Sequence, residues 1–175
     1  FADEKVCVPS ISLRQKDKNT DEIYIGYSSP KTPQRVYLYN IANKSKKLVK
    51  EQKIPSGHNP NNYIVERVEF KSHDGRLVPL TITRHKKTKL DGSANLLLYG
   101  YGSYGNSMSP SFSSTRLSLI NRNIIWATAH VRGGMEKGMK WWKEGKLINK
   151  KNTFEDYIFA AKYLIENKYS DKGKI

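Results

Sequence analysis

The chain has 175 residues and a hydrophobic fraction of 37%, with 11 Tyr, 5 Phe and 3 Trp whose large apolar surfaces exclude an intrinsically disordered chain. Its formal net charge is +15 at pH 7, but the basic residues are scattered along the whole sequence, which argues against a dedicated nucleic-acid surface. No run of about 18 apolar residues occurs, so the sequence also excludes a membrane-spanning helix.

Short β-type runs separated by turn-rich segments occupy the first third of the chain. The four expected strands are 6–13, 22–28, 35–41 and 47–53. Between them lie Pro, Asn, Asp and Ser, which favour tight reversals of the chain. Four short strands in about fifty residues suit one blade of a β-propeller, so we assign residues 1–56 to the terminal part of a propeller domain.

The pattern changes across residues 57–62, a stretch of Gly, Pro and Asn that we take as a linker. Residues 63–72 and 76–84 then alternate apolar with polar positions. Between these runs stands His73-Asp74-Gly75, and Asp-Gly is a strong β-hairpin signal because glycine tolerates positive φ. An antiparallel strand pair is therefore predicted.

Two near-continuous apolar runs follow, at 95–99 and 123–130, and such runs are typical of strands covered on both faces. Covered strands require flanking helices, and the clearest helix is predicted at 154–167 with Thr153 as its N-cap. Its expected apolar face consists of Phe154, Tyr157, Ile158, Ala161, Leu164 and Ile165. A further strand is expected to begin at 172–175.

A glycine-rich segment, Gly100-Tyr101-Gly102-Ser103-Tyr104-Gly105, follows the first of these strands and has the spacing of a dinucleotide-binding loop. Pro110 interrupts the helix that such a loop should open, and the strand at 123–130 ends without an acidic residue for a ribose. We therefore expect no nucleotide there. The sequence also has no His-Glu-x-x-His, Cys pair or Asp-x-Asp loop, so we expect no metal and no cofactor.

The same loop with its flanks, Leu97-Leu98-Tyr99-Gly100-Tyr101-Gly102-Ser103-Tyr104-Gly105, resembles the oxyanion loop of the prolyl oligopeptidase family of serine peptidases, in its oligopeptidase B (protease II) branch. Further segments occur in the order of that family: Arg116-Leu117-Ser118-Leu119, Ala129-His130-Val131-Arg132-Gly133-Gly134, Trp141-Trp142, Gly145-Lys146-Leu147 and Lys150-Lys151-Asn152-Thr153-Phe154-Glu155-Asp156-Tyr157. The resemblance covers residues 63–175 and extends more weakly upstream.

The resemblance implies a two-domain peptidase in which a propeller covers an α/β-hydrolase domain and which cleaves short peptides after Lys or Arg. Residues 63–175 would then form the N-terminal half of that hydrolase (peptidase) domain, with a mixed, mostly parallel sheet and flanking helices. Short basic peptides and the remaining part of the same enzyme are the implied partners. The family needs no cofactor.

The resemblance assigns Tyr101 the role of a hydroxyl donor to the oxyanion in the complete enzyme. Candidates for substrate contact are Tyr104, Arg132 and Glu136. Structural roles are the alternative at each position: Tyr101 would be a packed loop tyrosine, and Arg132 and Glu136 would form an ion pair that shapes a turn.

A serine nucleophile of this class of hydrolase stands in Gly-x-Ser-x-Gly, and no serine here has that setting. Ser103 comes nearest, with Gly105 two residues after it but Tyr101 two residues before it. Histidines before the missing serine would violate the family's order Ser, Asp, His; they are His58, His73, His85 and His130. We expect the chain to stop before the catalytic serine and to be inactive alone.

The alternative function is a non-catalytic basic module that binds nucleic acid or an acidic partner through its positive charge. For location, the single Cys7 excludes an internal disulfide and fits a reducing compartment. Residues 1–5 lack the apolar core of a signal peptide, so we expect a cytoplasmic protein.

Overall fold

The computed structural model describes residues 4–12 and 19–175, which divide into two compact units. The first unit extends to Asn61 and includes Pro110–Ser114, and the second comprises Asn62–Ser109 and Thr115–Ile175. A pattern read in chain order does not reveal that residues 110–114 group with the first unit. Within the described ranges, no helix combines the length and the apolar character that crossing a membrane requires.

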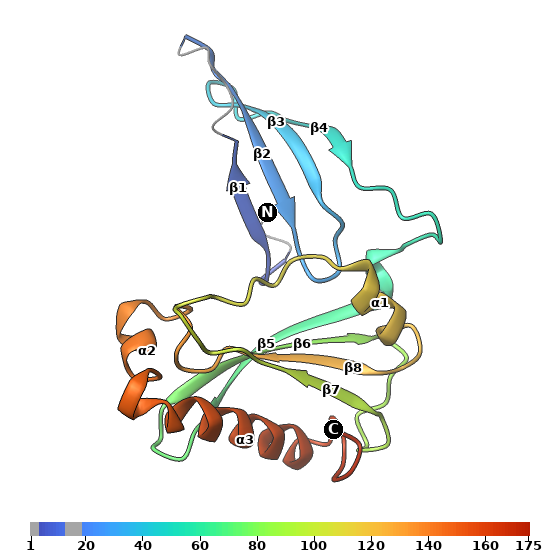
Figure 1. The fold of residues 1–175 in the computed structure, drawn as a ribbon. Coiled ribbons are helices and arrows are strands. Elements are labelled where there is room, and N and C mark those ends of the chain that lie inside the picture. The colour runs from blue at the N-terminus through green and yellow to red at the C-terminus, as the bar shows by residue number, and fades with distance from the viewer. Residues whose placement is uncertain (1–3, 13–18) are drawn as a thin grey trace. The chain divides into compact units, whose positions relative to one another are not determined.

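The first unit is a propeller-like antiparallel sheet in which each strand pairs with the next along the chain (Figure 1). Its strands are β1 (Val8–Ile11), β2 (Glu22–Ser28), β3 (Arg35–Asn40) and β4 (Lys46–Glu51). The four predicted strands are confirmed, although Leu13, the expected end of the first, lies outside the described residues. The β3–β4 turn uses the predicted chemistry, since the Asn40 side-chain oxygen accepts the Asn43 N–H at 3.0 Å.

The second unit contains a four-stranded sheet in the order β5-β6-β8-β7. Its strands are β5 (Tyr63–Lys71), β6 (Leu77–His85), β7 (Leu96–Tyr99) and β8 (Ile125–Ala129). The sheet is mixed, as expected, but it is not mostly parallel: β6 is antiparallel to both β5 and β8, and only β7 and β8 run parallel. The hairpin reverses the chain directly, whereas β7 reaches its parallel neighbour through a helical crossover.

The predicted hairpin between β5 and β6 is confirmed at Asp74-Gly75. Gly75 has a φ of +79°, and its N–H donates to the carbonyl oxygen of Ser72 at 3.0 Å. The Asp74 carboxylate accepts the N–H of Arg76 at 3.2 Å, which closes the turn. Glycine is the residue that adopts this left-handed backbone without a steric penalty.

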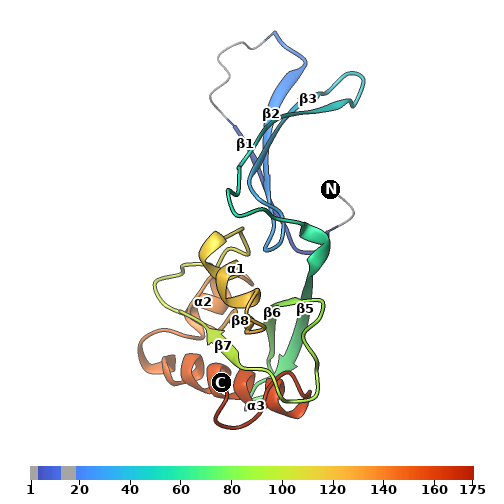
Figure 2. The same cartoon turned by 90° about the vertical axis from the view of Figure 1, so that its right-hand side faces the viewer.

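Helices cover both faces of this sheet. The helical segments are η1 (Pro60–Asn62), α1 (Ser114–Ile120), α2 (Met139–Lys143), η2 (Leu147–Asn149) and α3 (Lys151–Glu166). Two views place α3 along one face of the sheet and α1 on the opposite side (Figures 1 and 2). The core between sheet and helix includes Val78, Leu80, Ile82, Ile125, Ala127, Ala160 and Leu164, all of which are fully buried.

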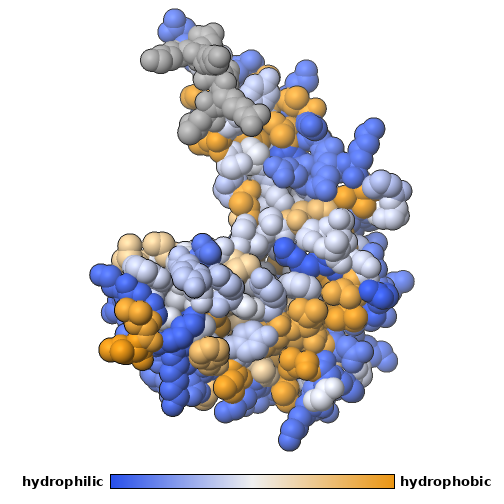
Figure 3. Space-filling model, viewed as in Figure 1, coloured by the Kyte–Doolittle hydropathy of each residue, from blue (hydrophilic) through white to orange (hydrophobic). Residues whose placement is uncertain are grey.

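Helix α3 differs from its prediction in its start and in its buried face. It begins at Lys151, and Thr153 is an internal residue whose hydroxyl donates to the carbonyl oxygen of Arg132 at 2.6 Å instead of capping the helix. Phe154 and Ile158, assigned to the apolar face, are 61% and 48% exposed. Figure 3 accordingly shows apolar side chains exposed among hydrophilic ones on this unit. Leu164 is fully buried as predicted, and it shares the buried face with Thr153, Asp156 and Ala160, which were not assigned to it.

The last residues lie at the edge of β7 without forming the strand predicted to begin at 172–175. The N–H of Lys174 donates to the carbonyl oxygen of Asp171 at 3.0 Å, which makes a turn. The N–H of Leu96 in β7 donates to the carbonyl oxygen of Lys174 at 2.8 Å. This segment therefore contacts the sheet edge through a turn.

Candidate active site

The glycine loop at 100–105 begins where β7 ends. Gly102 and Gly105 have φ values of +63° and +70°, in the left-handed region that glycine favours. A Cβ on Gly102 would lie 2.5 Å from the methyl carbon of Thr153 and 2.8 Å from the carbonyl oxygen of Arg132. Glycine at this position therefore lets the loop backbone lie directly against the start of α3 and the segment after β8.

Two further glycines extend this close contact. A Cβ added to Gly133 would overlap the carbonyl oxygen of Gly102 and would lie 2.9 Å from that of Gly145. The carbonyl oxygen of Gly133 also accepts the N–H of Gly105 at 3.0 Å. Three segments that are distant in the sequence thus pack backbone against backbone, and the loop is fixed where they meet.

Tyr101 projects from this loop and is 43% exposed. It lines a cavity of about 250 Å³ together with Gly100, Val131, Thr153, Phe154 and Tyr157. One wall is fixed, because the Tyr157 hydroxyl donates to the carbonyl oxygen of Leu98 at 2.7 Å. Across residues 4–12 and 19–175, no hydrogen bond engages the Tyr101 hydroxyl, so this donor is available to a ligand. The predicted role at an oxyanion has the accessible phenol that it requires.

Tyr104, a predicted substrate contact, lies in the same loop and points to solvent. It is 85% exposed and adopts a φ of +55°, which is uncommon for a residue other than glycine. The adjoining turn is closed by the N–H of Asn106, which donates to the carbonyl oxygen of Ser103 at 3.0 Å. The structure leaves Tyr104 accessible, and its contact with substrate stays a prediction.

Arg132, another predicted contact, is only 1% exposed and pairs with Asp156 and Asp74. Its guanidinium lies 2.6 Å from a carboxylate oxygen of each. Burial would lower the pKa of Arg132, but the hydrogen bonds that it donates to both carboxylates raise it above its usual range. The expected ion pair with Glu136 is therefore wrong, because two aspartates occupy the guanidinium. Substrate contact would require Arg132 to leave this pairing.

Glu136, the remaining candidate, belongs to a separate polar cluster with His130. Its carboxylate accepts the N–H of Met108 at 2.8 Å and lies 3.6 Å from His130 Nδ1. His130 Nε2 lies 2.7 Å from the Arg67 guanidinium and 2.8 Å from the Thr81 hydroxyl. Because arginine can only donate, Nε2 is the acceptor and the ring proton is assigned to Nδ1, facing Glu136. This cluster links the sheet to the segment that follows the glycine loop.

We expect the free energy of unfolding to decrease in mild acid because the folded protein buries His130. Burial lowers the pKa of His130 below its ordinary value of 6.5, and the Arg67 charge acts in the same direction while Glu136 opposes it. Below about pH 6.5 the His130 imidazole therefore binds a proton in the unfolded chain but stays neutral in the folded chain. The free energy of unfolding consequently decreases as the pH falls. Urea unfolding at pH 7.5 and 5.5 should show a smaller decrease for His130→Gln than for the parent. The exposed His73→Gln is the matched control, and equal decreases in all three proteins would contradict this assignment.

Ser72, His73 and Asp156 carry the three residue types of a catalytic triad but not its arrangement. The Ser72 hydroxyl donates to Asp156 at 2.6 Å and lies 3.3 Å from His73 Nδ1. In a triad the histidine stands between serine and aspartate and accepts the serine proton. Here the serine stands between the other two, and its proton is already committed to Asp156. The buried Ser72 is therefore part of the Arg132–Asp156 pairing rather than a nucleophile.

Lys150 also contacts the loop, although its sequence setting gives no indication of this. Its ammonium donates to the carbonyl oxygen of Gly102 at 2.5 Å and to the Ser103 hydroxyl at 2.7 Å. In the sequence it belongs to the basic stretch 137–151, which is typical of a solvated surface. Only the folded chain brings it to the loop.

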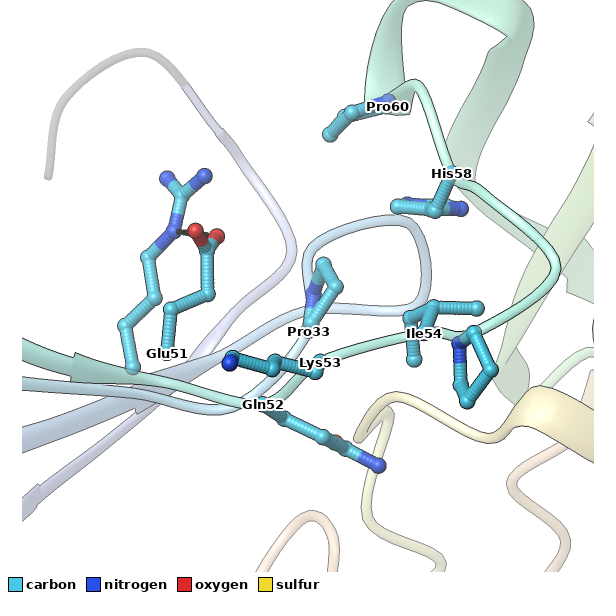
Figure 4. A pocket seen from close by; sticks show the side chains of 9 residues that line it. Pro33, Glu51, Gln52, Lys53, Ile54, His58 and Pro60 are labelled. Carbon is cyan, nitrogen blue, oxygen red and sulfur yellow. Dashed lines mark hydrogen bonds and ion pairs between the residues drawn. The ribbon is translucent and has the colours of Figure 1, made fainter.

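A second cavity, of about 690 Å³, lies within the first unit (Figure 4). Its lining includes Pro33, Lys53, Ile54 and His58, together with the ion pair of Arg35 and Glu51, whose Nε and Oε1 atoms are 2.6 Å apart. In this ion pair the Arg35 guanidinium and the Glu51 carboxylate compensate each other's charge. None of the predicted site residues is among those that line this cavity.

Known proteins resemble the chain in sequence and in structure. Residues 110–175 match the model of the prolyl oligopeptidase family. The chain is 38% identical over 175 residues to dipeptidyl aminopeptidase BI of Pseudoxanthomonas mexicana and 35% identical over 163 residues to protease 2 of Moraxella lacunata. These matches include 99% and 93% of this chain, respectively.

The solved structure of oligopeptidase B from Leishmania major superimposes with a TM-score of 0.88 at 34% identity, over 98% of this chain. The chain spans 24% of that protein and 24% of each of the two relatives above. The resemblance inferred from the ordered motifs is therefore confirmed, and it concerns about a quarter of the length of these relatives.

Proposed function

Because this chain belongs to the prolyl oligopeptidase family, we propose that it supplies part of the active site of a serine oligopeptidase, with Tyr101 as one donor to the oxyanion. The observation that carries this proposal is the accessible Tyr101 hydroxyl on a loop fixed by the backbone contacts of Gly102 and Gly133. A rigidly held donor stabilises developing charge without having to reorganise.

We propose further that the second unit is the first part of an α/β-hydrolase domain. Its parallel pair β7 and β8 and the helices on both faces of the sheet support this assignment. The antiparallel β5–β6 hairpin then forms the beginning of the domain. In such a domain the loop after a buried parallel strand lies at the carboxyl edge of the sheet, where ligands bind.

Hydrolysis by such an enzyme begins when a serine oxygen attacks the carbonyl carbon of the peptide bond and its proton passes to a histidine. The carbonyl oxygen becomes the oxyanion, and Tyr101 would donate its phenol proton in a hydrogen bond to it. We propose that the serine and the histidine come from sequence outside these 175 residues, since no serine here stands in a Gly-x-Ser-x-Gly motif.

For the substrate, we propose short peptides cleaved after Lys or Arg. The oxyanion loop at 97–105 supports this choice through its likeness to the oligopeptidase B branch, as does the structural likeness to oligopeptidase B of Leishmania major. Cleavage after proline is the competing specificity, because other members of the family are named for it.

The test uses the protein expressed from the complete reading frame and, separately, the 175-residue chain. Matched fluorogenic peptides carry Arg, Lys or Pro before the cleaved bond. We expect the complete protein to favour Arg and Lys over Pro in kcat/KM by at least about ten-fold, or about 1.4 kcal/mol. The 175-residue chain should show no turnover and no labelling by a fluorophosphonate.

Each outcome addresses a separate part of the proposal. Preference for Pro would overturn the substrate class and leave the reaction type intact. Absence of both turnover and fluorophosphonate labelling in the complete protein would refute the peptidase itself. Labelling of the purified 175-residue chain would reveal a nucleophile within it and would refute the proposed division of the site.

A further inference from the structure

We infer that Lys150 is a positioning residue for Tyr101: its ammonium holds the two residues after Tyr101 and thereby fixes where the phenol hydroxyl points. This inference rests on the proposed role of Tyr101. Lys150 need not touch the substrate, and it acts through the loop.

The contact is directed at the loop backbone next to Tyr101. The Lys150 ammonium donates to the carbonyl oxygen of Gly102 at 2.5 Å and to the Ser103 hydroxyl at 2.7 Å. Gly102 is the residue that follows Tyr101, and its φ of +63° lies in the left-handed region that glycine favours. Holding this carbonyl restricts rotation of the Gly102–Ser103 peptide, which begins one residue after Tyr101.

Lys150 is itself well anchored. It immediately precedes α3, whose first turns are fixed by the Thr153 hydroxyl on the Arg132 carbonyl oxygen at 2.6 Å and by the buried pair of Asp156 with Arg132. These contacts tie the start of the helix to the segment after β8. The lysine therefore connects a rigid element to the loop, as a positioning group must.

The electrostatics of Lys150 are unusual for a surface lysine. Its ammonium is partly buried and faces two neutral oxygens, and among the described residues no carboxylate lies within ion-pair distance. Burial accordingly lowers the pKa of Lys150. A cation held without a counter-ion costs free energy, so this placement is better explained by the contacts it makes to the loop than by a contribution to surface charge.

The test is a double-mutant cycle in the protein from the complete reading frame, using Lys150→Met, Tyr101→Phe and the double variant. Tyr101→Phe should lower kcat by about 100- to 1,000-fold. Lys150→Met should lower kcat by roughly 10- to 100-fold through misplacement of the phenol. The double variant should be no worse than Tyr101→Phe by more than about two-fold, because Lys150 has no function once the hydroxyl is gone.

The neighbouring Lys151→Met is the matched control, since the Lys151 side chain is 83% exposed and its contact is an ion pair with Glu155. It should leave kcat within about two-fold of the parent. Losses from Lys150→Met and Tyr101→Phe that multiply in the double variant would overturn the inference. Lys150→Arg, which keeps the charge and the donors, should recover part of the loss. Lys150→Gln, which removes the charge, replaces Lys150→Met in the cycle if the methionine variant does not fold.

Hydrogen exchange gives a readout that does not depend on activity. In Lys150→Met, the amides of Gly105 and Asn106, which are hydrogen-bonded in the loop, should exchange about ten-fold faster, while those of the β5–β6 hairpin stay unchanged. Unchanged exchange at Gly105 and Asn106 would overturn the inference. Faster exchange in a protein without peptidase activity would refute the proposed function and retain Lys150 as the residue that orders the loop.

Discussion

Replacement of Tyr101 by Phe should lower kcat by about 100- to 1,000-fold, or roughly 3 to 4 kcal/mol of barrier, in the protein from the complete reading frame. The phenyl ring of Phe still lines the cavity beside Gly100 and Phe154, so the shape of the loop surface is retained. Only the hydroxyl donor is lost. KM should stay within about two-fold, because the oxyanion forms after the substrate has bound.

The measurement is steady-state hydrolysis of one peptide amide and of the matching ester. Tyr99→Phe is the control, because this substitution also removes only a phenol hydroxyl. Tyr99 lies at the end of β7, and its ring packs near that of Trp126 with centroids 6.0 Å apart. It should leave kcat nearly unchanged. A Tyr101→Phe enzyme that keeps its parent kcat, or that loses activity only through KM, would exclude Tyr101 as an oxyanion donor.

Asp156→Asn should cost the fold about 3 kcal/mol or more of unfolding free energy. The substitution keeps the size of the side chain but removes the charge that compensates Arg132, and both residues are almost fully buried. It also removes a charged acceptor for the Ser72 hydroxyl and the Arg132 N–H. The remaining partner, Asp74, is partly exposed and compensates the buried cation less well.

Equilibrium unfolding in urea measures this cost, with Glu69→Gln as the matched change from carboxylate to amide. Glu69 pairs with Lys137 at 2.6 Å, but both side chains are exposed, so its loss should cost no more than about 1 kcal/mol. Equal costs for the two variants would show that burial does not strengthen the Arg132 pairing. That result would contradict the structural role assigned to Asp156.

The strands could be predicted from the sequence because the patterns that indicate them involve neighbouring residues. Alternation across 63–84 and the Asp74-Gly75 turn together determine the β5–β6 hairpin, and both signals depend on neighbouring residues. The apolar runs that became β7 and β8 were equally clear. The antiparallel pairing of β6 with β8 was not, because a strand's sequence carries little information about which distant strand it will pair with.

The buried face of α3 could not be predicted from the same kind of pattern. Periodicity counts Asp156 as a solvent-facing residue, yet Arg132, which is distant in the sequence, draws it into the interior. Phe154 and Ile158 are then turned outward although they are apolar. The buried face of α3 therefore combines the predicted Leu164 with a charged residue whose partner is distant in the sequence.

The residues of the candidate site could likewise be predicted from the sequence only in part. Tyr101 could be identified because a resemblance covers its neighbours, and its accessible hydroxyl fits the role proposed for it. Lys150 could not, because a lysine in a basic stretch gives no sign of its partners. Arg132 and Glu136 are close in sequence but belong to separate clusters, since Arg132 pairs with Asp74 and Asp156 whereas Glu136 lies beside His130.

Gly102, Gly133 and Gly145 lie where three backbone segments touch. Where main chains touch, even one added methyl group displaces the strand-end loop, so these three positions admit almost no variation. Tyr104, by contrast, stands in open solvent and can be exchanged at little cost. In the proposed peptidase, side chains on the outer side of the loop can therefore change while the backbone that carries Tyr101 stays constant beneath them.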